Sequence, residues 1–92
     1  MMNEILPHVR IGAADNDRTL VIVDDLELFD YVDTFLTQQC FLYPESVQAA
    51  RRPGGEVITA VFPPGRRAAL EDALRRLDPA EIEAVYRLNN PA

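Results

Sequence analysis

The sequence predicts a single α+β domain whose elements follow the order β-α-β-β-α-β, and three observations support this fold class. Runs of β-branched residues alternate with segments of helical periodicity in that order. The chain has 92 residues, which leaves room for one domain (residues 1–92). Its hydrophobic residues (48%) and charged residues (26%) are in the balance typical of a globular protein with one core.

The first predicted unit is a strand followed by a helix. Residues Thr19–Val23 are apolar and β-branched without interruption, which indicates a strand buried on both faces. Asp24 follows, and with Glu27 three residues later it predicts a helix start of the capping-box type. The helix is expected to run to about Cys40. Its predicted inner face consists of apolar residues spaced by three and four: Phe29, Val32, Phe35, Leu36 and Cys40.

A hairpin and a second helix are predicted next. Strands over Ser46–Arg52 and residues 56–62 flank Pro53-Gly54-Gly55, which predicts a three-residue turn. Residues 66–77 then show the periodicity of a helix. Its predicted inner stripe is Leu70, Ala73, Leu74 and Leu77.

The C-terminal segment has two interpretations. Alternating apolar residues between Ile82 and Leu88 predict a final strand, and the resulting β-α-β-β-α-β order resembles the ferredoxin-like fold. However, Asp78, Pro79 and Glu81 would also make a good helix start. In that alternative, β-β-α-β-β-α-α, residues 9–11 form a strand beside Thr19–Val23 and the chain ends in a helix. Residues 1–14 are therefore either an N-terminal extension or an extra strand.

In either arrangement the two central helices cover one face of the sheet. The other face carries half of the apolar side chains of the central strands and needs a cover. We expect either residues 1–14 or a second copy of the chain to lie there, the latter as a homodimer through the open sheet face.

The net charge of −6 is concentrated in one segment. Residues 13–33 contain seven acids and one arginine, so the rest of the chain is neutral. An acidic protein with a pI near 4.6 is unsuited to binding nucleic acid directly, or an anionic membrane, through a broad basic face. The segment instead predicts a surface for a basic protein partner. Its expected binding residues are Asp15, Asp17, Glu27, Asp30 and Asp33.

The basic residues are all arginines, and they suggest a weaker candidate site. Arg66 and Arg67 stand at a predicted helix start, where an anion would also find free N–H groups. Arg51 and Arg52 could add to such a site.

Catalytic chemistry has little support in the sequence. His8 is the only histidine and Cys40 the only cysteine, and neither stands in a catalytic or metal-binding spacing. We therefore expect no catalytic residues, no metal and no cofactor. No apolar run is long enough to span a bilayer, and the first residues lack the regions of a signal peptide, which predicts a cytoplasmic protein.

Three functions remain as hypotheses. The first is a non-enzymatic interaction module (a regulator, adaptor or inhibitor) that uses the acidic residues. The second is a dimeric α+β-barrel protein that binds or transforms a small molecule between its sheets. The third is an anion or nucleotide sensor at Arg66 and Arg67.

Overall fold

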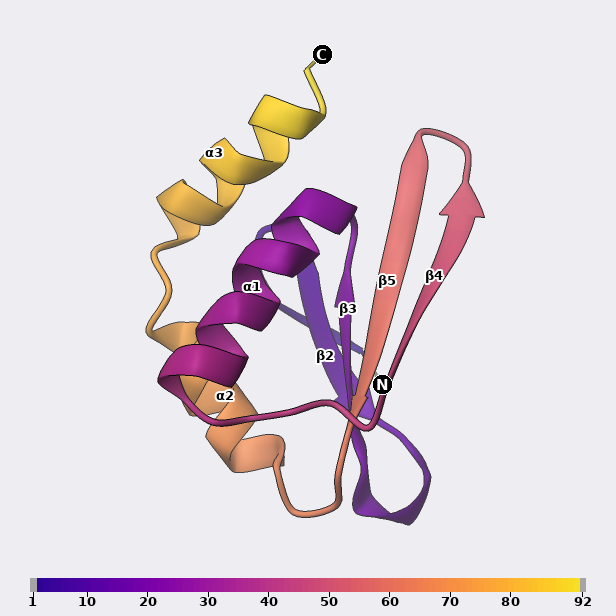
Figure 1. Cartoon of the computed structure of the whole chain (residues 1–92), viewed down its shortest axis with the longest axis vertical. Coiled ribbons are helices and arrows are strands. Elements are labelled where there is room, and N and C mark those ends of the chain that lie inside the picture. Colours follow the sequence, from indigo (N-terminus) through magenta and orange to yellow (C-terminus); the bar gives the residue numbers. More distant parts are fainter. Residues whose placement is uncertain (1, 92) are drawn as a thin grey trace.

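The computed structural model describes residues 2–91, and in it one antiparallel sheet carries three helices on one of its faces (Figure 1). The sheet order is β1-β2-β3-β5-β4. The strands are β1 (Asn3–Leu6), β2 (Val9–Ala13), β3 (Thr19–Val23), β4 (Ser46–Arg52) and β5 (Gly55–Phe62). The helices are α1 (Leu26–Gln39), α2 (Arg67–Arg75) and α3 (Pro79–Asn89), and a short 3-10 helix, η1 (Asp15–Asp17), joins β2 to β3. The predicted α+β class is confirmed.

The core lies between the sheet and the helices. β3 pairs with β2 on one side and with β5 on the other, so that side chains in register across the three strands share a face. The row Val9, Val23 and Ile58 is buried beneath the helices, and the helices contribute a matching set of fully buried side chains. These include Leu28, Val32 and Leu36 of α1, Leu70 and Leu74 of α2, and Ile82 of α3.

The C-terminal segment is a helix, so the strand expected between Ile82 and Leu88 is wrong. Asp78 caps α3 by accepting a hydrogen bond from the Ala80 backbone N–H at 2.9 Å, and Pro79 occupies the first turn. The place beside β3 is taken by β2, as in the alternative prediction. Capping and a proline at the helix start therefore outweighed the alternation of apolar residues. The N-terminal residues also form β1, a strand that the prediction did not separate from the extension.

Two further details differ from the prediction. The N-cap of α1 is Asp25 and not Asp24: its Oδ2 accepts from the Leu28 backbone N–H at 2.9 Å. The β4–β5 turn has two residues and not three, because Arg52 pairs with Gly55. Pro53 and Gly54 form it, and the φ of +92° at Gly54 explains the glycine.

β4 lies at the outer edge of the sheet, beyond the area that the helices cover (Figure 1). All seven of its residues are exposed, although every one of them is in register with β5. The other half of that hairpin is different, since Ile58, Ala60 and Phe62 of β5 are buried.

Candidate functional site

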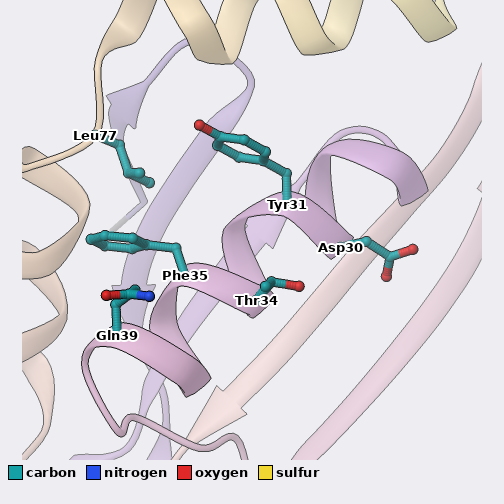
Figure 2. A pocket seen from close by; sticks show the side chains of 6 residues that line it. All are labelled: Asp30, Tyr31, Thr34, Phe35, Gln39 and Leu77. Atoms are coloured by element: carbon teal, nitrogen blue, oxygen red, sulfur yellow. The ribbon is translucent and has the colours of Figure 1, made fainter.

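An open groove lies between α1 and the corner where α2 turns into α3 (Figure 2). Its volume is about 430 Å³. The lining residues come mainly from one side of α1 and are Asp30, Tyr31, Thr34, Phe35, Gln39 and Leu77. The rings of Tyr31 and Phe35 and the side chain of Leu77 gather on one side of it, whereas Asp30 points away from them (Figure 2).

Helical periodicity explains why this groove is apolar. Leu28, Val32 and Leu36 point into the core, and Tyr31 and Phe35 lie one position before Val32 and Leu36, at the margin of the same stripe. They are therefore only partly covered: Tyr31 is 36% exposed, and Phe35 is half-buried against the core.

One end of the groove is negatively charged. The Tyr31 hydroxyl donates a hydrogen bond of 3.1 Å to Glu81 Oε2 at the start of α3. This bond to a carboxylate, together with desolvation and the charges of Glu81 and Asp78, raises the pKa of Tyr31. Asp30 lies one residue away on the outer side of α1. We call Asp30, Tyr31, Phe35, Leu77 and Glu81 the acidic groove.

The other end of the groove carries a cation. The guanidinium carbon of Arg76 lies 5.6 Å from the centroid of the Phe35 ring, close enough for a cation–π interaction. Arg76 Nη1 is also 3.8 Å from the sulfur of Cys40, just after the C-terminus of α1. The groove is therefore polarised, with carboxylates near Tyr31 and a guanidinium near Phe35.

The structure separates the five predicted acidic residues into two groups. Glu27, Asp30 and Asp33 are on α1, and the charge of Asp30, after burial, helps to raise the pKa of Asp33. Asp15 and Asp17 are in η1, at the opposite end of β3 from the start of α1. Asp17 also has a local role, since its Oδ2 accepts a hydrogen bond of 3.1 Å from the Gly65 backbone N–H.

The four arginines of the weaker candidate site do not meet. Arg66 and Arg67 follow the C-terminal end of β5, whereas Arg51 and Arg52 are at the hairpin turn by its other end. The two ends of β5, Gly55 and Phe62, are seven residues apart, which in a strand is a distance of about 23 Å. Arg67 donates to Glu71 at 3.1 Å, a pair within α2. Just before α2, the backbone N–H of Gly65 donates to the carboxylate of Asp17 and is therefore not available to an external anion.

Arg52 belongs instead to an ion cluster on the sheet face that the helices leave open. Asp24 Oδ1 accepts from Arg10 Nη2 at 2.9 Å and lies 3.3 Å from Arg52 Nη2. The apolar side chains next to this cluster, which include Ile22 and Val57, are half-buried. β1 and β2 extend the sheet sideways, because β2 pairs with β3 and β1 pairs with the other edge of β2.

His8 and Cys40 both make contacts that hold the fold together. His8 stacks on Tyr86 of α3 and lies 2.9 Å from Glu83, while Cys40 packs against the core. Within residues 2–91, histidine, cysteine and acidic side chains form no cluster of three or more that could hold a metal ion. None of the helices in this part of the chain is both long and apolar enough to cross a membrane.

Glu81 and Asp78 are neighbours of α1 that were not predicted from the sequence. Both residues follow Leu77, at the turn into α3. The helical conformation of α3 brings Glu81 within hydrogen-bond distance of Tyr31, and the strand that was predicted for this segment would not have done so. The available signal was the helix-start pattern Asp78-Pro79-Ala80-Glu81. Comparison with known proteins found no matching family model, no matching curated protein and no matching solved structure.

Proposed function

We propose that this protein is a small non-enzymatic interaction module of the cytoplasm, a regulator, adaptor or inhibitor, that binds a basic partner through the acidic groove. The observation that carries the proposal is an apolar groove flanked by two carboxylates, Glu81 at the Tyr31 hydroxyl and Asp30 on the outer side of α1. Glu27, one helical turn before Asp30, extends the negative charge along the outer side of α1.

The chemistry of the groove suggests an amphipathic partner. Tyr31, Phe35 and Leu77 can bury one large apolar side chain, which is the usual form of an energetic anchor at an interface. Arginines or lysines next to that anchor would meet Asp30 and Glu27, which favours fast association and selects against acidic partners. The partner's flank near Phe35 should carry no cation, because Arg76 is already there.

The proposed surface is smaller than the acidic segment of the sequence. Asp15 and Asp17 lie at the far end of β3, so they belong to it only if the partner also reaches that end of the molecule. We therefore assign the binding role to Glu27, Asp30 and Glu81, with Asp33 on the flank of the same helix.

The experiment is an NMR titration of the labelled protein with two basic peptides. One peptide carries leucines on one helical face and arginines on the other, and the second has the leucines replaced by serines. We expect the first peptide to shift the amide signals of Tyr31, Phe35 and Leu77, and the second to bind more weakly. Binding should weaken in about 0.5 M salt, because the Debye length, over which charges interact, shortens from about 10 Å at 0.1 M toward about 3 Å at 1 M.

A matched pair of variants separates this site from net charge. Asp30→Arg should weaken binding of the leucine peptide at least tenfold, whereas Asp15→Arg makes the same charge change in η1 and should leave it nearly unchanged. Equal effects of the two variants would contradict the proposal, as would shifts confined to other elements. Capture from host lysate with wild type and Asp30→Arg as baits would then identify the natural partner.

A second candidate is supported by the open sheet face, where apolar side chains such as Ile22 and Val57 are only half-buried. In this proposal two copies pack these faces together and enclose a small molecule. A protein that stays monomeric at millimolar concentration would contradict it.

We also propose a ferredoxin-like description of the fold. β3, α1, β4, β5 and α2 correspond to the first five elements of that arrangement. β2, which pairs antiparallel with β3, then takes the position of the missing last strand from the N-terminal side.

A further inference from the structure

The two edges of the sheet are built differently. β1 is four residues long, and its pairing with β2 shifts register between Glu4 and Leu6. Such an irregularity is one of the ways in which proteins protect an edge from further pairing. β4 is seven residues long and stays in register with β5 over its whole length. β4 also lacks proline, and its two charged residues, Arg51 and Arg52, both lie at the end next to the turn, so the rest of this edge carries no charge that would protect it.

The side chains of β4 are poorly supported by the rest of the chain. All seven are exposed, and Val47 is 47% exposed on the face where its neighbour on β5, Ala60, is fully buried. A hairpin arm solvated on both faces has little stability of its own. A strand added at the free edge would bond its unpaired backbone groups and cover Val47.

The charges of this edge are complementary to the edge of a second copy. Glu45 directly precedes β4. Its Oε1 accepts a hydrogen bond of 2.6 Å from Arg18 Nε, so Oε2 is the oxygen left for a partner, and Arg51 lies near the other end of β4. In an antiparallel pair with a two-fold axis at Gln48, Glu45 of each copy stands opposite Arg51 of the other. Arg51 forms no ion pair within residues 2–91 and is free to do so. The same register places Val47 opposite the small side chain of Ala49.

We propose that β4 pairs with β4 of a second copy in this register, so that two five-stranded sheets become one continuous sheet. The contact repeats the same surface on both sides of a two-fold axis and therefore closes as a dimer. One strand pair buries less than the 1,200–2,000 Å² or so of a stable interface, so the dimer should dissociate on dilution. This inference is independent of the acidic groove, which lies on the helices.

Sedimentation and cross-linking test the proposal together. The mass should rise from 10.3 kDa toward twice that value as the concentration increases toward millimolar. In a Cys40→Ser background, Gln48→Cys should form a disulfide-linked dimer under mild oxidation, because directly opposite Cβ atoms lie about 4.5–5.5 Å apart. Gln38→Cys, which replaces another exposed glutamine, on α1, is the matched control and should not cross-link.

Charge reversal tests the register. Arg51→Glu faces Glu45 of the other copy and should weaken the dimer at least tenfold. Glu45→Arg in the same chain should restore it, and both are compared in an Arg18→Gln background because Glu45 also pairs with Arg18. Arg75→Glu makes the same charge change on α2 and should have no effect. A monomer at all concentrations would overturn the proposal. A dimer that cross-links no better through Gln48→Cys than through Gln38→Cys would also overturn it, and would favour packing through the open sheet face.

Discussion

The imidazole of His8 lies parallel to the ring of Tyr86, with ring centroids 3.5 Å apart and an angle of 10° between the planes. The same imidazole has its Nε2 2.9 Å from Glu83 Oε2. His8 lies in the turn between β1 and β2, whereas Tyr86 and Glu83 lie on α3. The turn at the N-terminal end of the chain is therefore a principal anchor for the C-terminal helix.

Loss of this ring should loosen α3. We expect His8→Asn to lower the free energy of unfolding by about 1 kcal/mol, the scale of a stacked aromatic pair, and to speed amide exchange in α3. Asparagine suits the test because His8 has a φ of +65°, which asparagine tolerates better than most residues. Tyr86→Phe keeps the stack and serves as the control. Unchanged exchange in α3 of His8→Asn would show that the core contact of Ile82 holds the helix alone.

Glu83 should make stability depend on pH in the acid range. Its hydrogen bond from Arg87 and, to a smaller extent, its contact with His8 lower its pKa below the ordinary 4.5. A carboxylate with a lowered pKa in the folded state stabilises the fold above its unfolded pKa and loses that contribution as the pH falls through the folded value. Wild type should thus be more stable than Glu83→Gln at pH 6, and the difference should close below pH 4.5. Chemical denaturation across this range measures it, and a constant difference would contradict the assignment.

The elements that could be predicted from the sequence are those whose pattern lies within a single short segment. The strand Thr19–Val23, the helix that follows it and the hairpin were predicted because periodicity and turn residues are contained in each segment. The segment after Asp78 carried two local signals, alternation and a helix start. The side chain of Ile82 fits either, and only its burial against the rest of the core decides between them.

The candidate site was harder to predict because it depends on contacts between distant segments. The acids of α1 were identified from sequence, but their apolar neighbour Leu77 and the carboxylate of Glu81 come from beyond residue 75. The structure also places Asp15 and Asp30 beyond opposite ends of β3, a separation that the sequence does not reveal. Charge clustering in sequence therefore did not establish clustering in space.

Removal of Asp25 should destabilise the fold, because its carboxylate has two partners. One carboxylate oxygen caps α1 through Leu28, and the other accepts from Asn90 Nδ2 at 3.1 Å, which ties α1 to the end of α3. We expect Asp25→Ala to lower the free energy of unfolding by about 1–2 kcal/mol. Asp25→Ser retains a capping oxygen and should lose less. If the serine and alanine variants were equally unstable in urea denaturation, the bond to Asn90 would be the larger of the two contributions.

Asp33 should have the opposite effect, because its charge is unfavourable in the folded state. Burial on the side of α1, and then the charge of Asp30, raise its pKa above the ordinary 3.8. A raised carboxyl pKa means that folding favours the protonated form, so its contribution to stability declines as the pH rises through the interval above 3.8. We expect Asp33→Asn to stabilise the protein near neutral pH by roughly 0.5 kcal/mol or less, since the side chain is partly solvated.

The pH dependence distinguishes this effect of Asp33 from a change in helix propensity. The gain from Asp33→Asn should shrink as the pH falls toward 3.8, where the wild-type carboxyl becomes neutral too, whereas a propensity effect would persist in acid. Asp15→Asn, an exposed carboxylate outside α1, is the control for net charge. Thermal unfolding at pH 7 and at pH 3.8 measures both variants. A destabilised Asp33→Asn at neutral pH would mean that the carboxylate has a favourable partner that outweighs its burial and the charge of Asp30.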